Sequence, residues 1–449
     1  MINDTICAIA TPFGTGGIAV IRVSGSDAIT NVNNCFKGKD LKKVKSHTLH
    51  YGHIVSKDNE IIDEVMVAIM KGPKSFTAED VVEISTHGGV LVVQKVLERL
   101  LEEEIRLANP GEFSQRAYLN GRIDLVEADA IMDVISAKNE LALKVANLGV
   151  QKKTSALVYR LRDKLLNIIA NIEVNIDYPE YDDALVMSKE IVEPKVLELV
   201  NEIDELLINS KQTRLIREGI KTVIVGKPNV GKSSLLNRLL DEEKAIVTDI
   251  AGTTRDTIDA FVNLGGITLH LIDTAGIRTT DDYVEKIGVE RSKKALNEAE
   301  LVLLVLDQST ELTKEDQELL KLTEDKTRII VLNKADLKQA KISFNDAVII
   351  SAFKNEGIED LEKAIIKRLA LDSVNNNDFN YLSNARHIQK VKEAKIALDN
   401  VLKAISNNMP VDVYAIDLTD AWNMLGDIIG VRYEDELLDQ LFSKFCLGK

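Results

Sequence analysis

The stretch 226–233 reads Gly-Lys-Pro-Asn-Val-Gly-Lys-Ser and fits the pattern G-x-x-x-x-G-K-[ST]. It follows an apolar, β-branched run at 220–225 and leads into an amphipathic run at 234–240. A phosphate-binding loop requires this context, because glycines let backbone N–H groups turn inward and the helix N-terminus attracts anions. Lys232 would then reach the β- and γ-phosphates, and Ser233 would offer its hydroxyl to Mg²⁺. One short match can arise by chance, so the remaining sequence has to support it.

Composition limits the kinds of protein that carry this loop. A chain of 449 residues has room for two to four domains of about 100–200 residues each. Its net charge of −15 argues against general polyanion binding, so a nucleic-acid partner would need a local basic patch. The 3 cysteines lack paired spacing, which predicts no disulfide framework, no zinc site and a reducing compartment. No signal peptide is expected, and apolar runs such as 301–306 are too short to span a bilayer. We therefore expect a cytoplasmic protein.

Regions of three kinds, which differ in composition and hydrophobic periodicity, follow one another along the chain. Residues 1–118 hold glycine-rich turns, β-like runs at 18–23 and 64–70, and a helical run at 90–101, which predicts an α+β domain. Residues 119–218 and 373–449 have helical periodicity, and residues 219–372 alternate strands with helices, which predicts a mostly parallel sheet. We interpret this as an α/β P-loop domain inserted in an all-α domain, although four domains in series remain an alternative. One predicted buried helical stripe comprises Leu161, Leu165, Leu166, Ile169 and Ile172.

Two motifs after the phosphate loop resemble switch segments. In the run Asp249–Asp256, Thr254 would give a second hydroxyl to Mg²⁺. An apparent hairpin over 258–273, with two glycines at its turn, ends in Asp-Thr-Ala-Gly. Asp273 would hold Mg²⁺ through water, and the Gly276 N–H would meet the γ-phosphate.

Two later motifs predict the base that is bound. A strand at 328–332 precedes Asn333-Lys334-Ala335-Asp336. The Asp336 carboxylate would accept hydrogen bonds from N1–H and the 2-amino group of guanine, which adenine cannot donate. A strand at 348–352 ends in Ser351 and Ala352, a small loop suited to guanine O6. The ordered set of five motifs predicts a GTP site.

The group that positions the hydrolytic water is less defined. Ile277 occupies the place where many small GTPases carry glutamine, and it cannot orient water. The polar loop 279–285 contains carboxylates that would reach water, but its spacing alone favours a solvated loop. Arg255 and Arg278 are candidate charge stabilisers by proximity only. The amide oxygen of Asn229 offers another route, by holding a monovalent cation against the phosphates.

The chain resembles the MnmE (TrmE) family of tRNA-modification GTPases over its whole length. Besides the GTPase motifs, the resemblance rests on short segments along both ends of the chain: Ala10-Thr11-Pro12, Gly16-Gly17, Arg22-Val23-Ser24-Gly25, Ser75-Phe76-Thr77, Glu79-Asp80-Val81, His87-Gly88-Gly89, Pro110-Gly111-Glu112-Phe113-Ser114 and Phe445-Cys446-Leu447-Gly448-Lys449.

The resemblance implies a K⁺-activated GTPase that works as a homodimer with the FAD-containing partner MnmG (GidA), in a heterotetramer-type complex. Together they would modify carbon 5 of the wobble uridine of tRNA, giving an aminomethyl or carboxymethylaminomethyl group. The one-carbon donor would be a tetrahydrofolate derivative of the 5-formyl or methylene type, bound by the N-terminal domain. The resemblance also implies that the GTPase domain is inserted rather than serial. The rival readings are a ribosome-assembly GTPase that acts as a nucleotide-switched RNA-binding module, and a folate-dependent transferase with a degenerate GTPase domain.

The resemblance also assigns site residues by position. Glu285 matches the water-orienting glutamate, which reverses the preference from spacing. Asn229, Thr248, Ile250 and Thr253 match the K⁺ ligands, and Ser233 and Thr254 match the Mg²⁺ ligands. Arg22, Glu83, Arg122 and Lys449 match the folate positions, with arginine at 122 where lysine also occurs. The remaining predicted nucleotide contacts are Val230, Gly231, Lys232, Ser234, Asp249, Ala251, Gly252, Asp273, Thr274, Ala275, Gly276, Asn333, Lys334, Asp336, Ser351 and Ala352.

Overall fold

A computed structural model of the chain groups its residues into two compact units, 1–132 with 426–449, and 133–425. Each unit is considered by itself, and the domain boundaries given above stay predictions. The residues that the structure describes are 4–177, 189–241, 245–246, 260–264, 267–272, 295–338, 342, 344–369, 382–431, 442–443, 445 and 448.

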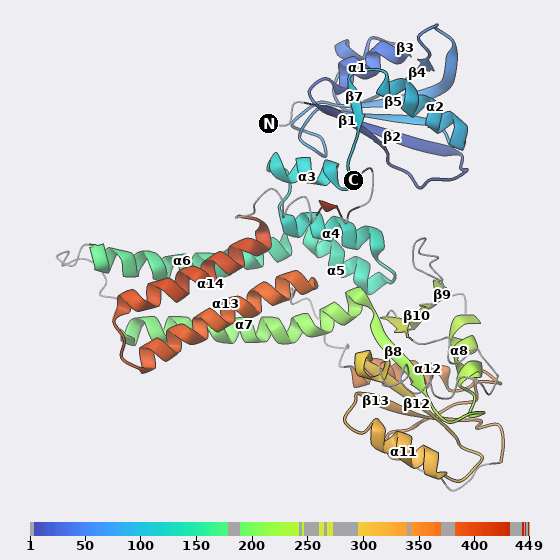
Figure 1. The fold of residues 1–449 in the computed structure, drawn as a ribbon, viewed down its shortest axis with the longest axis vertical. Coiled ribbons are helices and arrows are strands. Elements are labelled where there is room, and N and C mark those ends of the chain that lie inside the picture. Colours follow the sequence, from blue (N-terminus) through green and yellow to red (C-terminus); the bar gives the residue numbers. More distant parts are fainter. Residues whose placement is uncertain are drawn as a thin grey trace. The chain divides into compact units, whose positions relative to one another are not determined.

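The first unit is built on a seven-stranded sheet with strand order β3-β4-β5-β6-β2-β1-β7 (Figure 1). All neighbouring strands are antiparallel except β1 and β7, which are parallel. Strand β5 alternates buried and more exposed residues, as a sheet with one covered face requires. The sheet and the helices around it comprise β1 (Thr5–Ile9), β2 (Ile18–Ser24), α1 (Ala28–Cys35), β3 (Phe36–Gly38), a 3₁₀ turn (Leu41–Lys43), β4 (Thr48–Val55), β5 (Ile61–Met70), β6 (Val81–His87), α2 (Val90–Leu101), β7 (Ile105–Leu107) and α3 (Glu112–Leu119).

Helices α1 and α2 cover this sheet, and their apolar residues join its core. The helix predicted at 90–101 is confirmed as α2, and the strand predicted at 18–23 is confirmed as β2. The prediction of an α+β domain is therefore confirmed. Near the end of the chain, Phe442 is buried in a small cluster with Ala117 and Leu125.

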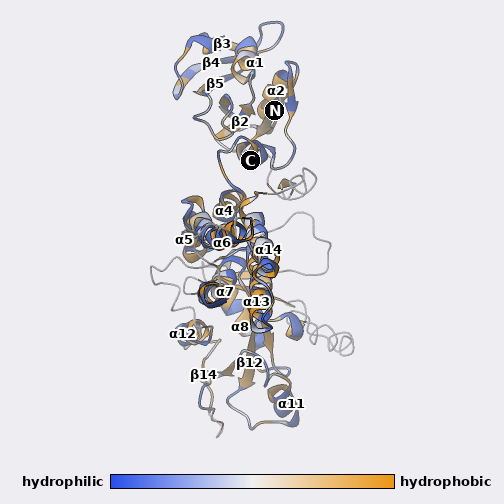
Figure 2. Cartoon of the chain, turned by 90° about the vertical axis from the view of Figure 1, so that its left-hand side faces the viewer, coloured by the Kyte–Doolittle hydropathy of each residue, from blue (hydrophilic) through white to orange (hydrophobic). Residues whose placement is uncertain are grey.

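Long helices follow this sheet along the chain. They are α4 (Leu125–Ser136), α5 (Glu140–Val150), α6 (Lys153–Asp177), α7 (Lys189–Glu218), α13 (Ala385–Ser406) and α14 (Val411–Ile429). Helix α13 packs along α7, so segments from both sides of the nucleotide module lie together (Figure 1). Figure 2 shows that these helices carry both hydrophilic and hydrophobic residues, as amphipathic helices do.

The stripe predicted on α6 is confirmed at four of its positions and wrong at one. Leu161, Leu165, Ile169 and Ile172 are buried, but Leu166 is 46% exposed. Each residue advances about 100° around a helix, which places Leu166 beyond the edge of the arc that Leu161, Leu165, Ile169 and Ile172 share.

The nucleotide module has a second seven-stranded sheet, ordered β14-β13-β12-β8-β11-β10-β9. The strands from β14 to β11 are parallel, and only β10 pairs antiparallel with its neighbours, which confirms the mostly parallel sheet. Every residue of the central strand β12 is buried. The elements are β8 (Ile220–Val225), α8 (Lys232–Asp241), β9 (Ala245–Ile246), β10 (Ala260–Leu264), β11 (Ile267–Leu271), β12 (Leu301–Asp307), α11 (Lys314–Leu322), β13 (Arg328–Asn333), β14 (Val348–Ile349) and α12 (Ile358–Arg368).

Candidate functional site

The predicted phosphate loop connects β8 to α8, as the sequence context requires. Two of its residues adopt left-handed backbone conformations, with φ of 62° at Asn229 and 95° at Gly231. Asparagine tolerates this conformation better than most residues, whereas Gly231 also lacks room for a side chain. A Cβ there would lie 2.2 Å from Asn333 Nδ2. The second motif glycine is therefore fixed by close packing as well as by its dihedral angles.

Lys232 folds back over the same loop. Its Nζ donates hydrogen bonds of 2.8 Å to the carbonyls of Gly226 and Lys227. Burial lowers the pKa of Lys232 from its ordinary value. The ammonium group is thus held against the loop that is expected to enclose the phosphates. Ser233, which follows at the start of α8, is an exposed residue next to Lys232.

Lys227, one of the variable positions of the motif, is anchored in a way that sequence reasoning missed. Its Nζ lies 2.7 Å from Asp316 Oδ2, and the two side chains are only 15% and 3% exposed. The same carboxylate oxygen accepts from the N–H and hydroxyl of Thr313, and the Asp316 N–H donates to Thr313 Oγ1, which completes the capping box of α11. Burial alone would raise the pKa of Asp316, but the bonds from Lys227 and Thr313 outweigh it and lower the pKa. The Thr-x-x-Asp spacing was the signal for this support.

Asn333 connects the phosphate loop to the base-binding loop. Its Nδ2 donates to the Val230 carbonyl at 2.9 Å, and its Oδ1 accepts from the Ala352 N–H at 3.0 Å. Asn333 is buried, so both bonds are protected from water. The Ala352 N–H, in the small loop predicted to suit guanine O6, is therefore directed at Asn333 in this structure.

Asp336 lies beside Ser351, as the two base motifs predict. Ser351 Oγ donates a 2.6 Å hydrogen bond to Asp336 Oδ1, and this bond lowers the pKa of the carboxyl group. The Ser351 hydroxyl engages only this oxygen of the carboxylate. An ionised carboxylate with one oxygen fixed is suited to accept from the donor edge of guanine. Lys334, which precedes Asp336 in the same motif, pairs with Asp307 at 2.6 Å at the end of β12.

Many of the predicted ligands lie outside the described residues. Among them are the catalytic candidate Glu285 and the tail residue Lys449. The others are Thr248, Asp249, Ile250, Ala251, Gly252, Thr253, Thr254, Asp273, Thr274, Ala275 and Gly276.

In the first unit, two of the predicted folate residues meet across the antiparallel strands β2 and β6. Arg22 and Glu83 are direct cross-strand partners, and Arg22 donates to Glu83 Oε1 from Nε at 2.9 Å and from Nη2 at 2.8 Å. The Arg22 guanidinium also lies over the rings of Phe76 and Phe113, at 5.5 and 5.8 Å from their centres. These two rings were missed as site residues, although both stand inside the quoted motifs.

The end of the chain reaches the same arginine. Arg22 Nη1 donates a 3.1 Å hydrogen bond to the carbonyl of Gly448. Gly111 makes this approach possible, since a Cβ at its φ of 71° would lie 2.2 Å from the Phe442 carbonyl. Arg122 is exposed, and its side chain makes no hydrogen bond or ion pair with any residue in the described part of the chain. The structure thus brings Arg22, Glu83 and the tail together, but not Arg122.

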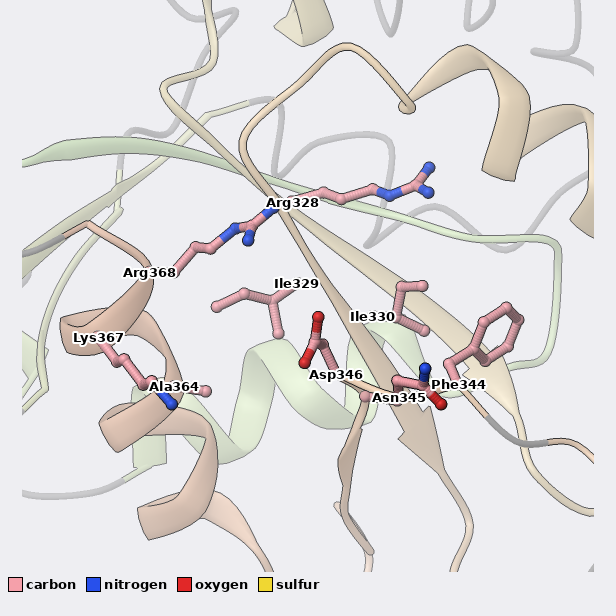
Figure 3. Close-up of a pocket in the computed structure, with 10 residues that line it drawn as sticks. Arg328, Ile329, Ile330, Phe344, Asn345, Asp346, Ala364, Lys367 and Arg368 are labelled. Carbon is pink, nitrogen blue, oxygen red and sulfur yellow. The ribbon is translucent and has the colours of Figure 1, made fainter.

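A pocket of about 680 Å³ lies at the opposite end of β13 from Asn333 (Figure 3). It is lined by Arg328 and Ile329 of β13, Lys367 and Arg368 of α12, and Asp346 before β14. The nucleotide motifs follow the carboxyl ends of the strands, so this pocket is separate from the site that they form.

The parallel sheet, the loop after β8 and the Asp336–Ser351 pair together define a P-loop protein of the GTPase class. Comparison with known proteins makes this assignment more specific. Residues 125–446 match the MnmE helical domain family, and residues 5–122 match the family described as GTP-binding protein TrmE N-terminus.

Curated relatives agree with these family matches. The chain is 64% identical to the tRNA modification GTPase MnmE of Acholeplasma laidlawii over 99% of both chains. It is 53% identical to that of Aster yellows witches'-broom phytoplasma over the whole of both, and 51% identical to that of Bacillus cytotoxicus over 99% of both. The chain belongs to the MnmE family of tRNA modification GTPases. This membership decides against the ribosome-assembly reading.

A solved structure of Era in complex with a piece of 16S ribosomal RNA matches 33% of this chain and 55% of its own at 32% identity. Its TM-score is 0.26, so the family assignment depends on the sequence relatives. No described helix is both long and apolar enough to cross a membrane.

Proposed function

We propose that this chain hydrolyses GTP in the course of tRNA uridine modification. The proposal rests mainly on the hydrogen bonds of the base-binding motifs. Asn333 bonds to both the phosphate loop and the loop at Ala352, and Ser351 orients Asp336. Relatives of at least 50% identity over nearly the full chain bear the name tRNA modification GTPase, which supports the same activity.

The finer chemistry that we propose follows the resemblance. The chain would act with the flavoprotein MnmG on carbon 5 of the wobble uridine, with a tetrahydrofolate derivative as one-carbon donor. The cluster of Arg22, Glu83 and the Gly448 carbonyl supports a ligand site in the first unit. A guanidinium that lies over two aromatic rings suits an anionic, aromatic ligand such as a folate. We also expect a homodimer in the cytoplasm.

For hydrolysis we propose that two ions and one carboxylate assist the phosphate loop. Asn229 is exposed in a left-handed turn of the loop, and its amide oxygen, with Thr248, Ile250 and Thr253, would hold K⁺. Hard oxygen ligands of this kind fit an alkali cation, and the hydroxyls of Ser233 and Thr254 would bind Mg²⁺. When bound, the ions supply positive charge to the phosphates, and Glu285 would orient the attacking water.

The decisive experiment measures GTP turnover in KCl and in NaCl at equal ionic strength. We expect turnover to rise at least about tenfold in KCl, since a correctly placed cation can do the work of an arginine finger, which is worth roughly 10³–10⁵ in rate. Glu285→Ala should nearly abolish turnover while GTP still binds, whereas Glu318→Ala, an exposed carboxylate on α11, should not. Equal rates in the two salts would refute the K⁺ proposal, and absence of GTP hydrolysis in both would refute the GTPase itself.

A further inference from the structure

The β10–β11 hairpin of the nucleotide module is bonded to the junction between α4 and α5, within the second unit. Asn139 Nδ2 donates a 2.8 Å hydrogen bond to Thr268 Oγ1. Thr268 Oγ1 donates to Asn263 Oδ1 at 2.7 Å, and Asn263 Nδ2 donates to the Lys138 carbonyl at 2.6 Å. Three side chains and one carbonyl thus form a continuous hydrogen-bonded chain that returns to the junction where it began.

This connection is packed as well as bonded. Lys138 Nζ lies 2.9 Å from the centre of the Phe261 ring on β10. Ala142, at the start of α5, is buried in the same core as Val262 and Leu269 of the hairpin. Thr268 is only 2% exposed, so its bonds are shielded from competing water. The junction therefore fixes the hairpin at several points rather than touching it at one.

The hairpin has a particular place in the chain. Thr254, the predicted Mg²⁺ ligand, stands six positions before Ala260, where β10 begins, and Asp273 stands two positions after Leu271, where β11 ends. The predicted switch segments adjoin the two ends of the hairpin, at Ala260 and Leu271. Contacts that hold the hairpin in place therefore also fix one end of each switch segment. Small displacements of such supports can cost as much as about 10²-fold in rate.

We propose that Asn139 and Thr268 form a latch that positions the hairpin for GTP hydrolysis and couples the α4–α5 junction to the switch segments. This inference rests on the proposed GTPase function and adds a positioning role for residues outside the nucleotide motifs. Asn139 does not touch the nucleotide site, and it acts only through the hairpin.

Asn139 also accepts from the Ala142 N–H at 2.7 Å as the N-cap of α5, so the test has to separate the two roles. Asn139→Ser keeps an efficient cap and removes the donor to Thr268. Thr268→Val removes the hydroxyl at nearly constant volume, and Thr268→Ser restores it. All three variants are made in the full-length chain, and their thermal unfolding is compared with that of the wild type.

We expect Asn139→Ser and Thr268→Val each to lower kcat about fivefold, the change that one ordinary hydrogen bond supports, with KM for GTP nearly unchanged. The double variant should be no worse than the worse single variant, because both break one chain of bonds. Thr268→Ser should recover most of the rate. A purely structural role would instead lower the unfolding temperature of every variant and leave kcat of the folded protein intact.

The latch is refuted if both variants, folded and melting like the wild type, keep the wild-type kcat. It is also refuted if Thr268→Ser loses as much rate as Thr268→Val, since the methyl group rather than the hydroxyl would then be responsible. These outcomes differ from failure of the GTPase proposal, in which the wild-type chain itself would not hydrolyse GTP.

Discussion

The two seven-stranded sheets of this chain carry their candidate sites in different ways. In the nucleotide module the site gathers loops that follow parallel strands, and Asn333 joins two of those loops directly. In the first unit the site lies in mid-strand, where Arg22 faces Glu83 across an antiparallel pair, and it receives Gly448 from the far end of the chain.

This difference explains why the two sites differ in their sequence signals. Parallel strands end at one edge of a sheet, so each strand end can carry a short motif that is readable by itself. A mid-strand site leaves only single charged residues, which look like ordinary surface charges. Its assembly depends on the sheet register and on the docking of a distant tail.

The largest effect is expected at the base selector of the nucleotide module. Asp336→Asn replaces an acceptor with a donor that opposes the N1–H and 2-amino groups of guanine, so GTP affinity should fall about 10³-fold or more. Xanthosine triphosphate presents an oxygen at position 2, and its affinity should rise. Titration of both nucleotides measures the change, with exposed Asp346→Asn as the matched control. Unchanged GTP affinity would remove Asp336 from the base site.

A smaller effect is expected at the site of the first unit. Arg22→Ala removes the pair with Glu83 and the bond to Gly448, and charged hydrogen bonds of this kind correspond to about 10- to 100-fold in affinity. Binding of 5-formyltetrahydrofolate should weaken by that factor in calorimetric titration, whereas Lys37→Ala, an exposed charge on β3, should leave it unchanged.

Gly111→Ala tests the long-range part of that site separately. The added methyl group would collide with the Phe442 carbonyl and displace the tail without altering Arg22 or Glu83. We expect weaker folate binding here too. If a variant with a displaced tail bound folate with wild-type affinity, the site would need only the Arg22–Glu83 pair. The site of the first unit would then not depend on the distant end of the chain.

The smallest effect concerns the acid stability of the first unit. Burial would raise the pKa of Glu112, but hydrogen bonds from Arg106, the Asn109 N–H and Arg116 outweigh it and lower the pKa from its model-compound value of 4.5. A depressed carboxyl pKa stabilises the fold above the unfolded-state value, and this contribution is lost as pH falls through the folded-state value. Glu112→Gln should therefore destabilise by about 1–3 kcal/mol at pH 7 and by much less in acid, below the folded-state pKa.

Calorimetry of the full-length chain at both pH values checks this prediction. Glu98→Gln serves as the control, because its pair with Lys95 is exposed on both sides and should matter little. An equal loss for Glu112→Gln at pH 7 and at low pH would contradict the assigned ionisation.

The sequence predicted elements best where one local signal was sufficient. The strand at 220–225 and the helix at 90–101 appear with those bounds, because β-branched runs and amphipathic periodicity act over short distances. Leu166 is exposed because it lies just beyond the edge of the buried face of α6, where the apolar pattern of the sequence does not mark the boundary. The Lys227–Asp316 pair escaped notice because its partners are 89 residues apart, although the capping box at Thr313 was visible.

The sequence by itself determined the GTPase class and the family, because motif order, spacing and residue type are written along the chain. Only the tertiary structure decided which side chains support those motifs. The packing of Gly231 against Asn333, the anchoring of Lys227 by Asp316 and the approach of Gly448 to Arg22 all join distant residues. Such contacts depend on strand order and sheet register, which arise only when the hydrophobic cores close, and no local pattern encodes them.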